Sequence, residues 1–186
     1  MNLLEGRYRP LLTVTPLLVL LDQWTKYLVD ARMLLHQSVP ILPGWFDLTY
    51  VRNRGAVFGF LAGVDSWWRM PFFIGFSAIA VILLAIFYVR SRPDQGLLRF
   101  SLALILAGAV GNVIDRLRFG YVIDFLDVHW RTYHWPAFNV ADSAISVGIA
   151  LMLLEAYLEG RREHRAAANE REGSSRRQKL RTASDK

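Results

Sequence analysis

The 20 residues from Met70 to Val89 contain no charged side chain. An apolar run of about 20 residues lets an α-helix cross the hydrocarbon core of a bilayer, where only helices and closed barrels satisfy the backbone. Three further apolar segments, at about 10–29, 97–114 and 140–158, are long enough for the same role. The sequence therefore predicts an all-α membrane protein with four transmembrane helices, in a single domain over residues 1–158.

The basic residues predict how these helices are oriented. Of the 22 Lys and Arg residues, 9 lie after Leu158, in the last 28 residues. Others gather before residue 10 and in the turn at 90–99, and the positive-inside rule puts such segments in the cytoplasm. We therefore expect both termini inside. The tail at 159–186 has the composition of a disordered segment, and its charge suits anionic lipid better than nucleic acid, because the rest of the chain consists of apolar blocks.

Two polar segments are then left on the outer side. In the first, Phe46–Val51 and Ala56–Phe60 are β-branched and aromatic runs on either side of a turn at 52–55, so we expect a small β-platform over about 40–61. The second, 117–138, is too charged to cross a membrane. It contains Trp130 and Trp135, and tryptophan is typical of the membrane–water interface.

Polar side chains are predicted to meet at one level of the outer leaflet, because the first and third segments run outward and the fourth runs inward. They are Asp22, Lys26, Asn112, Asp115, Arg116, Asp124, Asn139 and Asp142. Charged groups in or beside a membrane are costly, and they indicate a functional site.

An aspartate pair is one interpretation of this cluster. Two carboxylates held close together cannot both ionise easily and can share a proton, which permits amide hydrolysis by Asp124 and Asp142 without a metal. The residues alone leave other roles open. Asp142 could cap the fourth helix, Asp124 could be a turn residue, and Asp22 could form an ion pair with Lys26, four residues on.

Other functions also remain open at this point. Lys26 could activate Ser143 or Ser146, the chain could be a non-catalytic scaffold, or it could transport protons through a relay of Asp22, Asp115 and Asp142. Metal binding is not indicated, because His129 and His134 are five residues apart rather than in the His-x-x-x-His spacing of a helical zinc site. The chain has no cysteine. We predict neither a metal nor a cofactor.

Five ordered motifs resemble those of the lipoprotein signal peptidases (signal peptidase II), the membrane aspartic peptidases of bacteria. They are Asp22-Gln-Trp-Thr-Lys26, Asn53-Arg-Gly-Ala-Val-Phe-Gly59, Gly111-Asn-Val-Ile-Asp-Arg116, Val122-Ile-Asp124-Phe125 and Phe138-Asn-Val-Ala-Asp142-Ser143. The resemblance covers about residues 10–158 and leaves out only the basic tail. It implies a multi-pass protein of the bacterial cytoplasmic (inner) membrane with its active site at the extracytoplasmic face.

The resemblance also implies roles for individual residues. Asp124 and Asp142 would be the catalytic pair. The site would be lined by Asn53, Asn112, Arg116 and Asn139, and supported by Asp22, Lys26 and Asp115, of which we expect Asp115 to pair with an arginine.

The family's substrate and fold give further expectations. Its members cut prolipoproteins just before a cysteine that carries a diacylglyceryl group. They have a β-cradle and a short amphipathic periplasmic helix, which correspond here to 30–69 and 117–138. We therefore expect a monomer whose partners are a prolipoprotein and membrane lipid, with no role for nucleic acid.

Overall fold

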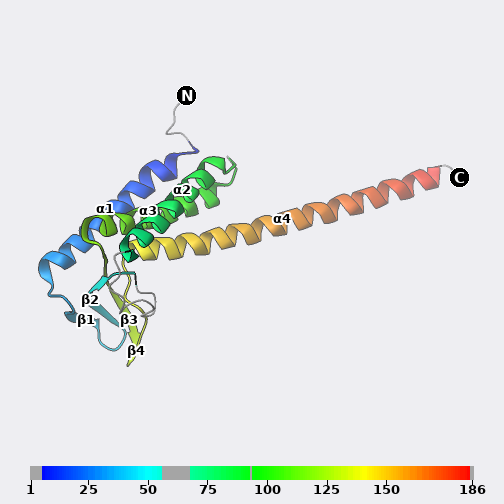
Figure 1. Ribbon diagram of the computed structural model, residues 1–186. Helices are drawn as coiled ribbons and strands as arrows, with labels where there is room; N and C mark the ends of the chain where they lie inside the picture. The colour runs from blue at the N-terminus through cyan, green and yellow to red at the C-terminus, as the bar shows by residue number, and fades with distance from the viewer. Residues whose placement is uncertain (1–5, 56–67, 93, 185–186) are drawn as a thin grey trace.

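The computed structural model describes residues 6–55, 68–92 and 94–184 and is mostly helical (Figure 1). Its elements, in chain order, are α1 (Arg9–Arg32), β1 (Ser38–Leu42), β2 (Phe46–Asn53), α2 (Arg69–Arg90), α3 (Gly96–Phe119), β3 (Val122–Trp130), β4 (Tyr133–His134) and α4 (Val140–Ser184). The sheet lies at the end of the bundle where α1 and α3 end and α4 begins. Side chains from those three helix ends can therefore meet side chains of the sheet.

Among the described residues, three helices are long and apolar enough to cross a membrane: Met70–Arg90, Gly96–Phe119 and Val140–Arg162. In α3, 61% of the apolar window is buried inside the protein, against 6% in α2, so α3 is the central helix and α2 is peripheral. Helix α1 has 24 residues but carries Asp22, Gln23 and Lys26. The fourth transmembrane helix therefore stays a prediction.

Gly108 and Gly111 of α3 allow close packing of the helices. A Cβ atom on Gly108 would collide with the backbone oxygen of Ala141 and lie 2.6 Å from Ile145 Cγ1. A Cβ atom on Gly111 would lie 2.5 Å from Asp22 Oδ2. Small residues at such positions let helix backbones approach each other in a membrane protein, and here they bring the first turn of α4 against α3.

We expect Gly108→Ala to lower the free energy of unfolding by about 1–3 kcal/mol, because the added methyl group overpacks the contact between α3 and α4. Gly75→Ala on α2 is the matched control, since a Cβ atom there meets nothing within 4 Å. Alanine has the higher helix propensity, so the control should be neutral or slightly stabilising. Thermal unfolding in detergent would measure both variants, and equal effects would contradict the packing argument.

The described strands form one antiparallel sheet in the order β1-β2-β3-β4. The predicted turn at 52–55 is wrong in its first half, because Arg52 and Asn53 end β2 and pair with Ile123 and Val122 of β3. The second predicted run, Ala56–Phe60, lies outside the described residues. A strand distant in sequence supplies the pairing, which local turn signals cannot reveal.

Two further predictions need correction. The segment 117–138, for which we expected an amphipathic helix or loop, contains β3 and β4, and α3 continues to Phe119 before ending at Gly120, whose φ of 77° only glycine adopts readily. The tail at 159–186, expected to be disordered, continues α4 as far as Ser184. The tail contains no proline and is rich in Ala, Arg and Glu, which have high helix propensity.

A hydrophobic cluster of Val29, Tyr50, Ile123 and Phe125 joins the end of α1 to β2 and β3. Ile123 and Phe125 flank Asp124 in β3, and Ile123 is 1% exposed. A second cluster packs α2 against α3 through Tyr88, Leu102, Ala103 and Leu106. The first cluster fixes the sheet to the bundle and thereby sets where Asp124 lies.

Candidate active site

Asn139 begins the site by capping α4. Its Oδ1 accepts a hydrogen bond from the backbone N–H of Asp142 at 2.9 Å, the contact by which an N-cap residue satisfies a free helical N–H group. The N–H of Ala141 donates to Asp22 Oδ1 at 2.9 Å. The proposal that Asp142 is the cap is therefore wrong, because Asn139 is the cap and Asp142 lies in the first turn of α4.

Asp124 lies within β3, opposite Val51 of β2, and not in a turn. Its side chain is 2% exposed. One carboxylate oxygen accepts a hydrogen bond from Asn53 Nδ2 at 2.9 Å and the other from Asn139 Nδ2 at 2.7 Å. Burial raises the pKa of Asp124 to about 7, the negative charge of Asp142 adds to this, and the two amide hydrogen bonds act against it.

Asp142 is less enclosed than Asp124 and is only half-buried. Its Oδ1 accepts a hydrogen bond from Asn112 Nδ2 at 2.7 Å. Asn139 therefore contacts both aspartates, Asp124 through its amide nitrogen and Asp142 through its amide oxygen. One asparagine thus holds a strand and a helix start together at the two carboxylates.

A buried ion-pair cluster lies behind Asn112. Lys26 Nζ lies 2.8 Å from Asp22 Oδ2 and 2.9 Å from Asp115 Oδ2, and all three side chains are at most 2% exposed. The predicted pair of Asp22 and Lys26 is confirmed. The predicted arginine partner of Asp115 is wrong, since its cationic partner is Lys26, while Gln23 Nε2 donates to Asp115 Oδ1 at 2.8 Å.

Gln23 is a supporting residue that the sequence analysis missed. Its Nε2 also contacts Asp22 Oδ2 and the backbone oxygen of Gly111, both at 3.2 Å. The sequence signal for this role is that Gln23 is a polar residue within an apolar segment, between Asp22 and Lys26. Polar side chains in such a segment indicate a functional or supporting role.

The contacts of Lys26 argue against a serine–lysine mechanism. An ammonium group has three N–H donors. Those of Lys26 are occupied by Asp22, Asp115 and Asn112, the last at 3.1 Å. Ser143 Oγ instead donates to the backbone oxygen of Asn139 at 2.9 Å. Lys26 is therefore not placed to take a proton from Ser143.

Arg116 and Asn53 complete the set of predicted site residues. Arg116 Nη1 makes long contacts of 3.4 Å with Ser77 Oγ of α2 and with the backbone oxygen of Asn112. Its charge interacts with those of Asp142 and Asp124. Asn53 holds its own backbone by accepting from Gly55 N at 2.9 Å while it donates to Asp124. The predicted lining residues thus surround one pair of carboxylates.

His129 and His134 are brought together by pairing of β3 and β4, with ring centroids 4.6 Å apart. His129 lies 3.2 Å from Asp47 Oδ1, and this carboxylate raises the pKa of His129. His134 lies 2.9 Å from Asp127 Oδ2. Among the described residues, no three His, Asp or Glu side chains are arranged to hold a metal ion. Each imidazole is matched with one carboxylate.

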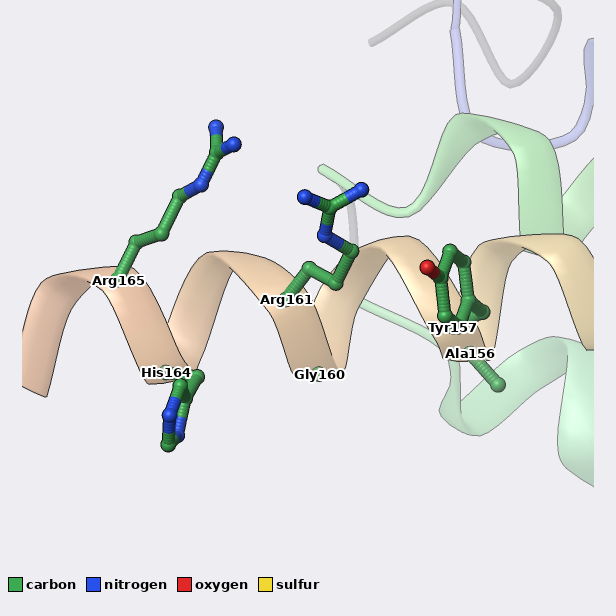
Figure 2. Close-up of a pocket in the computed structure, with 6 residues that line it drawn as sticks. All are labelled: Ala156, Tyr157, Gly160, Arg161, His164 and Arg165. Carbon is green, nitrogen blue, oxygen red and sulfur yellow. The ribbon is translucent and has the colours of Figure 1, made fainter.

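A hollow along α4, shown in Figure 2, is separate from the two aspartates. It is lined by Ala156, Tyr157, Gly160, Arg161, His164 and Arg165, all from one stretch of α4. A single helix cannot enclose a peptide, and this surface carries no carboxylate. The candidate site is therefore the pair of aspartates at the other end of the apolar part of α4.

Two neighbouring carboxylates, one buried with a raised pKa and one accessible, are the arrangement that activates water and protonates a carbonyl oxygen. Together with the apolar helices, they are typical of a membrane hydrolase of the aspartic type. The chain belongs to the signal peptidase II family, whose model, described as signal peptidase (SPase) II, matches residues 14–158.

Curated relatives support the same family over most of their length. A lipoprotein signal peptidase of Syntrophotalea carbinolica is 53% identical over 155 residues, which cover 83% of this chain and 95% of that protein. One of Geobacter sulfurreducens is 55% identical over 145 residues, covering 78% of this chain and 89% of the relative.

A solved structure supports the fold. It is a bacterial membrane enzyme determined by the in meso method at 2.3 Å resolution, with a TM-score of 0.70 and 33% sequence identity. The match covers 80% of this chain and 87% of that one. The helical membrane fold predicted from the sequence is thereby confirmed at the level of its class.

Proposed function

We propose that this protein is a lipoprotein signal peptidase in which Asp124 and Asp142 hydrolyse the peptide bond before a diacylglyceryl-modified cysteine of a prolipoprotein. The observation that carries the proposal is the double contact of Asn139, which ties buried Asp124 to half-buried Asp142. The raised pKa of Asp124, about 7, supports a proton held on the pair at neutral pH.

The reaction follows from sharing that proton. One carboxylate takes a proton from water as the resulting hydroxide attacks the scissile carbonyl carbon, and the protonated aspartate gives its proton to the carbonyl oxygen. When the tetrahedral intermediate collapses, a proton passes to the leaving nitrogen and the C–N bond breaks. No covalent enzyme intermediate is needed.

The neighbouring polar groups have positioning roles in this proposal. Asn53 and Asn139 hold Asp124, and Asn112 holds Asp142. Arg116 lies within electrostatic range of both carboxylates, and its guanidinium would orient the substrate backbone or stabilise the charge that develops on the carbonyl oxygen.

The placement in the membrane supports a lipid-linked substrate. We propose that α1 is the fourth transmembrane helix, because Lys26 is buried and paired rather than exposed to lipid. With both termini in the cytoplasm, the sheet and the aspartates lie at the extracytoplasmic face of the bacterial inner membrane. Trp45, Trp130 and Trp135 at the sheet are 60–66% exposed, as interfacial anchors would be.

A substrate of this kind explains why the site lies where a bundle meets a sheet. A diacylglyceryl cysteine keeps its acyl chains in the bilayer, and its signal helix lies beside them. A monomer with a site at the membrane surface can reach the bond between these two parts, whereas a soluble protease cannot.

Cleavage should fall at alkaline pH. The pKa of Asp124 is raised to about 7, so the carboxyl is protonated below that pH and ionised above it. Once both aspartates are ionised, no shared proton remains, and kcat/KM should fall about tenfold for each further pH unit. Initial rates measured from pH 5 to 10 would test this, and a constant rate up to pH 9 would contradict the shared-proton mechanism.

The central experiment compares two substrates with the purified protein in bilayers, one prolipoprotein with a diacylglyceryl cysteine and the same chain without lipid. We expect cleavage just before the cysteine of the lipidated chain only, identified by mass spectrometry, and no effect of a chelator. Absence of cleavage by folded protein, with proton flux across the vesicle, would replace this proposal with transport.

A further inference from the structure

The amide of Asn112 has a fixed orientation. Its Oδ1 accepts from Lys26 Nζ at 3.1 Å and from Asn139 Nδ2 at 3.3 Å, and its Nδ2 donates to Asp142 Oδ1 at 2.7 Å. If the amide were flipped, its NH2 group would face an ammonium and another NH2 group, while its oxygen would face a carboxylate. The network therefore settles which end of Asn112 meets Asp142.

Lys26 supplies the cationic contact that helps to fix this orientation. It reaches Asn112 from a buried cluster in which two carboxylates, Asp22 and Asp115, lie within 2.9 Å of its ammonium group. The cluster is closed to solvent, and Asn112 itself is 6% exposed. The positive charge of Lys26 is thus separated from the Asp142 carboxylate by a single amide.

The two aspartates differ in their surroundings. Asp142 lies in the first turn of α4, where the helix dipole favours a negative charge, and it is half-buried. Asp124 is buried within β3 at 2% exposure. A proton shared by the pair is therefore better placed on Asp124.

We propose that Lys26 is a positioning residue which, through Asn112, keeps Asp142 ionised as the general base and so leaves the shared proton on Asp124. This inference rests on the proposed function and assigns a separate role to each aspartate.

The assignment gives a balanced cycle. Asp142 takes a proton from water while the hydroxide adds to the carbonyl carbon, and Asp124 gives its proton to the carbonyl oxygen. As the resulting diol collapses, Asp142 protonates the leaving nitrogen, the C–N bond breaks, and Asp124 takes a proton from one diol hydroxyl. Both aspartates return to their starting states.

The test is the pH profile of kcat for Lys26→Met combined with Asp22→Asn. This pair of changes removes one positive and one negative charge, which avoids leaving an extra uncompensated carboxylate in the buried cluster. We expect kcat to fall about 10- to 100-fold, which is the loss seen in metalloenzymes when a hydrogen-bond partner of a functional residue is removed. The acid limb, which reports protonation of the base, should move up by about one pH unit, with KM within about twofold.

Asp22→Asn alone is the matched control. It keeps Lys26 and its contact with Asn112, so its acid limb should stay at the wild-type pH or below it. A loss of kcat in the double variant without any movement of the acid limb would show that Lys26 only supports the fold, and would overturn the proposal.

Additivity gives a second readout. If Lys26 acts through Asn112, the same double change made in an Asn112→Ala background should lower kcat by less than about threefold further, because the connection is already broken. Multiplicative losses would contradict the connection. Should the Lys26 variant fail to fold, Asn112→Ala breaks the connection between Lys26 and Asp142 without adding a charge beside Asp142. It must then show the acid-limb shift, and an unshifted limb would reject the proposal.

Failure of the proposed function would be seen separately. Cleavage by Asp142→Asn would reject the aspartate pair itself, whatever Lys26 does. An inactive Asp142→Asn together with an unshifted Lys26 variant would reject only the role of Lys26.

Discussion

Asp124→Asn and Asp142→Asn are each expected to lower kcat for prolipoprotein cleavage by at least about 10⁴-fold, the scale seen when a catalytic group is removed. Asparagine has nearly the same shape as aspartate but can neither take a proton from water nor hold one for the carbonyl oxygen. Single-turnover assays with lipidated substrate in bilayers would measure the loss.

The two variants should differ in stability. Both oxygens of Asp124 accept hydrogen bonds, from Asn53 and Asn139, so an asparagine there must turn its NH2 group toward another donor. We expect a loss of about 1–3 kcal/mol of unfolding free energy for Asp124→Asn. Asp142→Asn can keep an oxygen toward Asn112 and should unfold like the wild type, which makes it the cleaner test of chemistry.

Asp127→Asn is the matched control for both. Asp127 lies on β3 with Asp124, but its side chain contacts His134 of β4. Its variant should cleave within about twofold of the wild type. Substantial turnover by Asp142→Asn, or an equal loss in Asp127→Asn, would show that the sheet, and not the aspartate pair, limits the rate.

Asn139→Ala should produce the second largest effect. The amide of Asn139 donates to Asp124 at 2.7 Å and caps α4 by accepting from Asp142 N at 2.9 Å. Loss of a positioned donor at a catalytic carboxylate should lower kcat about 10²- to 10³-fold. Loss of the cap should lower the unfolding free energy by about 1 kcal/mol.

Asn139→Ser separates these two effects. Serine is a good N-cap residue, so the unfolding free energy should return close to the wild-type value. Its side chain is too short to hold Asp124 as well, so kcat should stay as low as in Asn139→Ala. Recovery of cleavage along with stability would show that Asn139 matters only as a cap.

The sequence alone predicts those features of the fold and the site that depend on a local pattern or on a specific motif. The absence of charged residues from 70 to 89 predicts a transmembrane helix there. The four-residue separation of Asp22 and Lys26 predicts their ion pair, which is buried in the structure. The five motifs predicted the family to which the chain belongs.

The predictions for strand pairing and for the conformation of the tail were wrong in part. The sequence at Arg52 and Asn53 is typical of a turn, but these residues belong to β2, because they pair with residues of β3. The segment 117–138 was expected to be helix or loop, because nothing in its own composition reveals which strand it will pair with. The polar composition of the tail predicts disorder, but its residues have high helix propensity, and α4 continues through it as far as Ser184.

Residue period and segment length set the helices and strands, and the amino-acid sequence supplies the polar groups that are available to a site. Which of these polar groups contact one another depends on the tertiary structure. Lys26 pairs with Asp115, Asn139 joins Asp124 to Asp142, and the Asn112 amide takes one orientation, because α1, α3, α4 and the sheet converge at one end of the bundle. Contacts between segments far apart in the chain depend on that packing, and no local spacing encodes them.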